Sequence, residues 1–142
     1  MKAYLLVLTA ALCGGTVFAI DEAALIKQLE TGSVEQKFQA RQTLLSKGTA
    51  AAVPGLAELL KKPETYEDAR FLLMSLGLPE ADAVLLARLN EASPKEQPDL
   101  LLALLRRKNA QALPIAFRLA GEKGEAAPAA RAYLAAFALP PN

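Results

Sequence analysis

Histidine and tryptophan are absent from the 142 residues, and the single cysteine, Cys13, lies near the amino terminus. A zinc site would have to be built from carboxylates alone, and a serine or threonine nucleophile would lack an imidazole base. No glycine-rich loop follows a predicted strand, so a phosphate-binding loop is not expected. These absences argue against an enzyme, and we expect no catalytic, metal-binding or cofactor-binding residues.

An excess of charge is also missing. One of the 16 Lys and Arg residues, Lys2, precedes residue 20, so the rest of the chain carries as many basic as acidic residues, 15 of each. A balanced chain has no electrostatic attraction to nucleic acid or anionic lipid. Basic and aromatic residues do not interleave either, as they do in single-strand-binding surfaces. We therefore expect no nucleic-acid partner.

The first nineteen residues have the pattern of an export signal. Lys2 supplies a positive charge, residues 5–12 form an apolar run, and residues 17–19 place small side chains at the cleavage positions. Cleavage after Ala19 would leave residues 20–142 as one domain, periplasmic or secreted, with no segment inserted in a membrane.

Two alternatives to cleavage stay open. Residues 3–20 are uncharged and almost long enough to remain as a membrane anchor. Cys13 would be the lipid attachment site of a lipoprotein, although Leu12 is not the small residue that normally precedes a lipidated cysteine.

Beyond residue 20, apolar residues recur at intervals of three and four, and Ala and Leu outnumber Val, Ile and Thr. Both features are typical of helices rather than strands. Ser33 with Gln36, Thr65 with Asp68, and Ser93 with Glu96 have the spacing of helix-start capping pairs. The pattern predicts eight helices joined by short loops, hence antiparallel hairpins. They are expected at 21–31, 34–47, 50–62, 65–76, 79–91, 95–108, 110–122 and 125–138.

Helices of similar sequence recur at a spacing of about thirty residues. ARQTLLSKG at 40–48 returns as ARFLLMSLG at 69–77, and the segment at 52–59 has counterparts at 82–89 and 112–119. Such a repeat indicates that each hairpin cannot bury its own apolar stripe and must stack on copies of itself.

The chain resembles the HEAT-repeat family of α-solenoids. The resemblance rests on a first helix with the sequence SVEQKFQARQTLLSKG and a second helix with AVPGLAELL, in which Pro54 lies in the opening turn. It implies an all-α fold in which residues 20–142 form a short right-handed α-solenoid of about four antiparallel helical hairpins. It also implies a concave face lined by the second helices, and a function in binding another protein.

Candidate binding residues follow from a thirty-residue register. If Leu56, Leu86 and Ala116 point inward, positions one turn apart on the second helices stand together on the concave face. Exposed apolar side chains flanked by charges would suit a docking segment, unless a further helix covers them. The expected protein-binding residues are Leu85, Arg88, Ile115, Arg118 and Glu58.

The remaining charged and aromatic residues have simpler interpretations. The basic run 106–108 ends a helix, where cations suit the helix dipole. Arg41, Arg70 and Arg131 recur on the first helices and are expected to be solvated. Most aromatic residues are expected in the core: Phe38, Tyr66, Phe71, Phe117, Tyr133 and Phe137.

The sequence thus favours an exported, non-enzymatic scaffold or adaptor of the cell envelope whose partner is another protein. The alternatives are a membrane-tethered structural protein and an accessory subunit of an envelope enzyme complex. A lyase-like enzyme similar to the phycobilin lyases, which also carry HEAT-like repeats, is the least favoured alternative because histidine and mature cysteine are absent.

Overall fold

The computed structural model describes residues 20–138, and within that range the chain is helical with no strand. The prediction of an all-α fold is confirmed, and each predicted helix is present to within a few residues at its ends. The helices are α1 (Glu22–Thr31), α2 (Val34–Lys47), α3 (Val53–Leu59), α4 (Tyr66–Ser75), α5 (Pro79–Glu91), α6 (Gln97–Arg106), α7 (Leu113–Gly121) and α8 (Ala127–Ala138). The expected export signal at 1–19 lies outside the described residues.

Helix starts show which capping predictions were correct. Ser33 forms both bonds of its capping box with Gln36. Ser93 does not cap α6, because its amide and hydroxyl donate to the Glu96 carboxylate and the α-helix begins only at Gln97. Thr65 makes no side-chain cap either, since its buried hydroxyl donates to the Leu59 carbonyl at 2.7 Å and so closes the end of α3.

Two predicted helices begin with a tighter 3₁₀ turn, at Ala50–Ala52 and Ala110–Ala112. The α-helical geometry starts one residue before Pro54 and Pro114. A proline has no amide hydrogen to donate and is tolerated only in the first turn of an α-helix, which explains why α3 and α7 are short.

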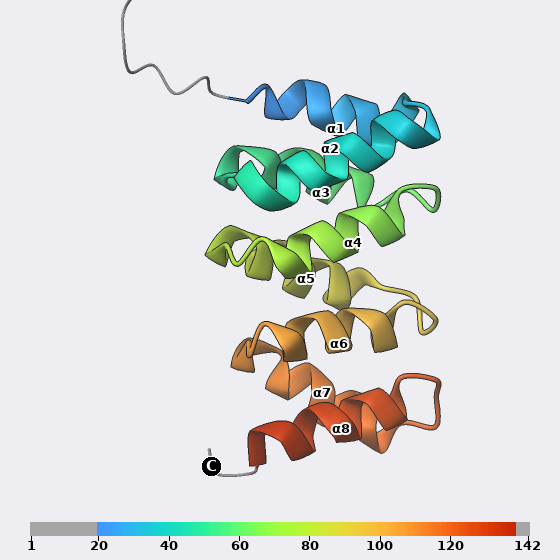
Figure 1. The fold of residues 1–142 in the computed structure, drawn as a ribbon. Helices are drawn as coiled ribbons and strands as arrows, with labels where there is room; N and C mark the ends of the chain where they lie inside the picture. The colour runs from blue at the N-terminus through green and yellow to red at the C-terminus, as the bar shows by residue number, and fades with distance from the viewer. Residues whose placement is uncertain (1–19, 139–142) are drawn as a thin grey trace, which may run out of the picture.

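The helices stack in order along one direction, from α1 at one end to α8 at the other (Figure 1). The even-numbered helices pack in one row, α2 on α4, α4 on α6 and α6 on α8, while α1, α3 and α5 pack in a second row. A continuous apolar core, mostly Leu and Ala, lies where the rows meet.

Equivalent core positions in successive hairpins are not always thirty residues apart. From the first to the second position of each series the spacing is one residue shorter than thirty, and from the second to the third it is one residue longer. In the even row, Leu44, Leu73 and Leu104 are fully buried. The neighbouring Leu105 is only half-buried, so Leu104 is the core position of α6. In the odd row, Leu56, Leu85 and Ala116 are fully buried with the same two spacings. The residue missing from the first spacing and the residue added in the second both lie in loops between helices. The two rows therefore shift by the same amount and stay aligned with each other.

Polar contacts join successive layers of the stack. Arg41 on α2 pairs with Asp68 on α4 at 3.0 Å, so this arginine is not simply solvated as expected. Arg107, directly after α6, pairs with Asp82 on α5 and donates to the carbonyls of Met74 and Leu78. Its side chain is only 8% exposed, so this member of the predicted helix-end basic run is a buried link between α4, α5 and α6.

Candidate functional site

Leu85 was expected as an exposed docking residue, and this prediction is wrong. Its side chain is 0% exposed and belongs to the core between the rows. The error comes from the register: α5 follows α3 with one residue fewer than the assumed spacing, so Leu85 aligns with the inward Leu56, while Leu86 is only half-buried. Replacing Leu85 would therefore test stability, not binding.

Ile115 is half-buried and packs against the core. In the observed register it aligns with Val84 and with Gly55. A Cβ atom at Gly55 would lie 3.0 Å from the Ile26 side chain, so at this position α3 lies close to α1. Ile115 is therefore less available to a partner than expected.

The three charged candidates differ in their environments. Glu58 and Arg118 are exposed and form ion pairs within their own helical turns, with Lys61 at 2.8 Å and Glu122 at 3.0 Å. Such pairs contribute little to stability and leave both charges accessible to a partner. Arg88 is largely buried, and the structure does not bring the five candidates together as one patch.

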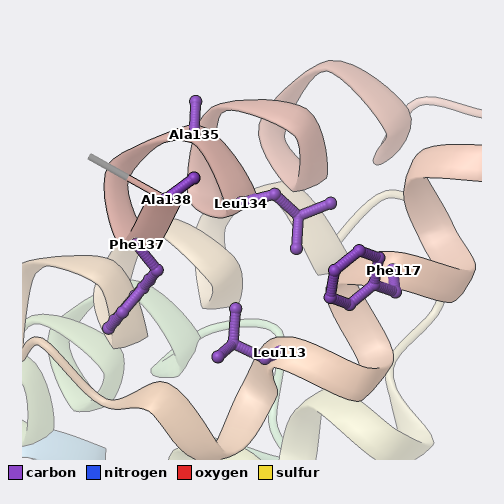
Figure 2. Close-up of a pocket in the computed structure, with 6 residues that line it drawn as sticks. All are labelled: Leu113, Phe117, Leu134, Ala135, Phe137 and Ala138. Carbon is purple, nitrogen blue, oxygen red and sulfur yellow. The ribbon is translucent and has the colours of Figure 1, made fainter. Parts of the chain in front are cut away.

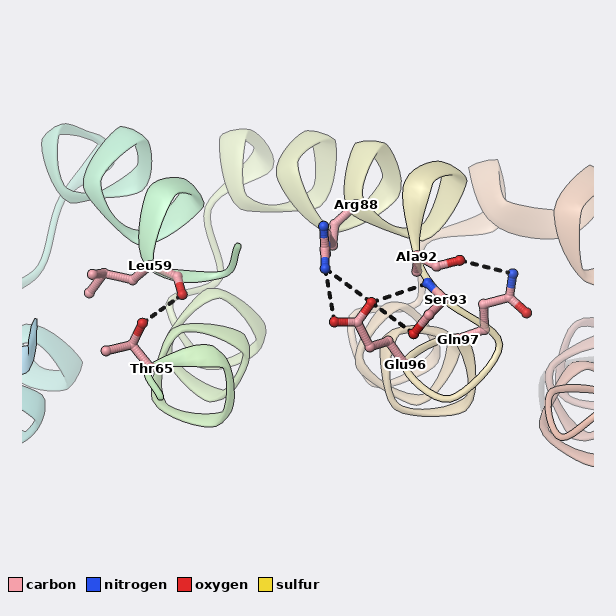
Figure 3. Close-up of polar contacts among 7 residues, drawn as sticks. All are labelled: Leu59, Thr65, Arg88, Ala92, Ser93, Glu96 and Gln97. Atoms are coloured by element: carbon pink, nitrogen blue, oxygen red, sulfur yellow. Dashed lines mark hydrogen bonds and ion pairs between the residues drawn. The ribbon is translucent and has the colours of Figure 1, made fainter. Parts of the chain in front are cut away.

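Arg88 links α5 to the start of α6 (Figure 3). Its guanidinium donates to both carboxylate oxygens of Glu96, at 2.8 and 3.0 Å, and Ser93 donates to the same carboxylate. Burial opposes ionisation of Glu96, but the hydrogen bonds from Arg88 and Ser93 prevail and lower the pKa of its carboxyl. The buried Arg88 Nε has no acceptor within residues 20–138.

A cleft of about 250 Å³ lies between α3 and α5, beside Arg88. Small and aliphatic side chains form much of its wall, and charges of both signs line the rest. The lining residues are Ala57, Leu60, Lys61, Val84, Ala87, Arg88 and Glu91. Of the predicted residues, only Arg88 lines this cleft. If the prediction had used the observed spacing between α3 and α5, which is one residue shorter, it would have named Val84 in place of Leu85 as a binding residue.

A second, larger groove of about 410 Å³ lies at the end of the stack between α7 and α8 (Figure 2). Leu113, Phe117, Leu134, Ala135, Phe137 and Ala138 line it, and none carries a charge. Phe117 was expected in the core but is 67% exposed, and Phe38 and Phe71 are also exposed, whereas Tyr66 and Tyr133 are buried as predicted. Phe117 follows Leu113 by four residues and Phe137 follows Leu134 by three, which are ordinary helix intervals, so no local pattern marks these side chains as lining a groove.

Other chemical features are few in the described part of the chain. Residues 20–138 contain no cluster of three or more acidic side chains placed to hold a metal ion. None of the helices in this range combines the length and the apolar character needed to cross a bilayer. Burial raises the pKa of the Tyr66 phenol to about 12, although the positive charge of Arg70 opposes the shift.

Comparison of the chain with protein-family models, with curated proteins and with solved structures gives no match.

Proposed function

We propose that this protein is an exported, non-enzymatic scaffold or adaptor that binds another protein on the face lined by α3, α5 and α7. The proposal includes a short right-handed α-solenoid of HEAT-like hairpins. It is supported by the stacking of paired helices and by buried core positions that recur in both rows with the same two spacings. Stacked repeats present wide, rigid surfaces because each layer rests on its neighbours.

The cleft between α3 and α5 is the observation that carries this proposal. Ala57, Val84 and Ala87 give it a small-residue wall, and Lys61 with Glu91 place opposite charges along it. An apolar centre with polar groups at the edge is the composition of protein interfaces. The cleft suits an extended or helical segment of a partner whose own apolar residues are flanked by charges.

Arg88 gives the cleft a fixed wall. Because Glu96 holds its guanidinium with two hydrogen bonds, the side chain is ordered before any partner arrives. Ordering in advance lowers the entropy cost of binding.

Substitution of Ala87 by arginine tests this binding face. Ala87 is exposed and lines the cleft, so the larger side chain fills the cleft without disturbing the core. The matched control is Ala132→Arg, at an exposed position of α8 on the even row. A partner identified by crosslinking and co-purification with the wild type should be lost with Ala87→Arg and kept with Ala132→Arg. Equal retention by both variants would refute the proposed face.

The proposed export is tested separately by the intact mass of the protein isolated from cells. A mature chain that begins at Ile20 is expected. A full-length mass would favour a retained anchor, and a lipid-bearing Cys13 would favour a lipoprotein; either result contradicts cleavage after Ala19.

A further inference from the structure

Every helix of the odd row has a glutamate at or near its carboxyl end. These residues belong to the ends of α1, α3, α5 and α7 in turn, and they are Glu30, Glu58, Glu91 and Glu122. The carboxyl end of a helix dipole is negative, so an acidic side chain is unfavourable there and a cation is favourable. Each of these glutamates therefore lowers stability unless a positive charge lies beside it.

Three of the four glutamates have a cation partner within the described part of the chain. The ion pairs are Glu30–Lys62, Glu58–Lys61 and Glu122–Arg118. Glu91 is exposed and forms no ion pair with any residue of 20–138. The cation in the last turn of its own helix, Arg88, is held by both carboxylate oxygens of Glu96 instead. Glu91 is thus the member of the series whose charge is left uncompensated.

Glu91 also lines the cleft between α3 and α5. Lys61 and Arg88 line the same cleft, but each is already engaged by a carboxylate, Lys61 by Glu58 and Arg88 by Glu96. The uncompensated charge of the cleft is therefore negative, and the carboxyl ends of α3 and α5 add partial negative charge to it. Electrostatic complementarity then requires a cation on the segment that occupies the cleft.

The apolar part of the cleft lies one helical turn before this charge. Val84 and Ala87 precede Glu91 on α5, and Ala57 of α3 lines the cleft with them. The rise along the helix from Ala87 to Glu91 is about 6 Å at 1.5 Å per residue. Residues two apart in an extended peptide, or four apart in a helical one, are separated by about the same distance. The cleft, at about 250 Å³, is smaller than the roughly 300–1,000 Å³ of small-molecule sites and suits a few side chains of a peptide.

We infer that the partner segment bound in this cleft carries a lysine or arginine close to an aliphatic residue, two positions away if the segment is extended and four if it is helical. The aliphatic side chain packs against Val84, Ala87 and Ala57, and the cation pairs with Glu91. This inference rests on the proposed binding face and names the chemistry of its partner. It gives a binding role to an acid at a helix position where stability alone favours a cation.

Selection of random peptides displayed on phage against the purified protein tests the inference. Peptides that bind the wild type but not Ala87→Arg bind in the cleft, and they should contain the basic and aliphatic residues at the stated spacing. A labelled synthetic peptide of this class should bind Glu91→Gln about threefold and Glu91→Lys about tenfold more weakly than the wild type, because the attraction is first removed and then reversed. Replacing the peptide's cation by glutamate should restore binding to Glu91→Lys.

Glu125→Lys is the matched control, because it makes the same change of net charge at an exposed position outside the cleft and should bind the peptide as the wild type does. Glu91→Lys should unfold at a higher urea concentration than the wild type, so weaker binding cannot come from a loss of fold. Wild-type affinity in Glu91→Lys, or cleft-bound peptides without lysine or arginine, overturns the inference and leaves the cleft as a binding site. If no selected peptide is lost with Ala87→Arg, the cleft proposal fails as well.

Discussion

Replacement of Arg107 by methionine should cost the protein about 3 kcal/mol of its free energy of unfolding. Arg107 is 8% exposed, pairs with the Asp82 carboxylate, and donates to the carbonyls of Leu78 at 2.8 Å and Met74 at 3.3 Å. It therefore satisfies acceptors on three consecutive segments of the chain. Methionine keeps the apolar stem of the side chain but removes the guanidinium and with it every donor.

The magnitude follows from what is left behind. Breaking a fully buried ion pair costs about 3–5 kcal/mol, but the Asp82 side chain is 25% exposed, so water recovers part of this loss. Each carbonyl left without a partner adds up to about 1–3 kcal/mol, with water again offsetting some of it. A total of about 3 kcal/mol is expected. With a urea m-value of about 2 kcal/mol/M, the unfolding midpoint should fall by about 1.5 M.

Urea unfolding followed by circular dichroism suits a chain without tryptophan. Arg106→Met is the control, because Arg106 is the exposed neighbour and should cost less than about 0.5 kcal/mol. Asp82→Asn alone and combined with Arg107→Met completes a double-mutant cycle, in which the two losses should not add. Equal effects of Arg106→Met and Arg107→Met would show that Arg107 is an ordinary helix-end cation.

The structure also fixes the sign of the stability change for three other substitutions, at Lys108, Gly77 and Glu96. Lys108, after α6, has a φ of 54°, and Gly77, after α4, has a φ of 69°; both values lie in the left-handed region that favours glycine. In the same urea assay, Lys108→Gly should therefore raise the free energy of unfolding by about 1 kcal/mol and Gly77→Ala should lower it by about 1 kcal/mol. A change of the opposite sign in either variant would contradict the left-handed conformations. The folded state lowers the pKa of Glu96, so its contribution is present above the unfolded pKa of about 4.3 and is lost as pH falls through the folded value. Glu96→Gln should therefore be less stable than the wild type at pH 7, by about 1 kcal/mol, with the difference shrinking towards pH 3; a pH-independent difference would mean that the carboxylate charge contributes nothing.

Helix positions could be predicted from the sequence because their signals are local. Intervals of three and four between apolar residues, the Ser33–Gln36 box and the two prolines act within one or two turns. ARQTLLSKG and ARFLLMSLG align without a gap, and the aligned residues Ala40 and Ala69, like Leu44 and Leu73, are all fully buried.

The candidate site was less predictable because it depends on alignment across loops. A shift of one residue between α3 and α5 turns a helical position by about 100°, enough to move Leu85 from the surface to the core. The contacts that long side chains make between layers could not be predicted either. Glu22 accepts from the amide and hydroxyl of Thr49, and Arg107 reaches Asp82, at sequence separations of 27 and 25 that no local pattern marks.

Among the helices of residues 20–138, extensive contacts join only those that are adjacent or next but one along the chain, such as α2 with α4 and α6 with α8. Closing such short loops costs little entropy, so folding should be fast and should not require the two ends to meet. A chain that emerges gradually, from a ribosome or from an export channel, can therefore complete each hairpin as it appears and use it as the template for the next.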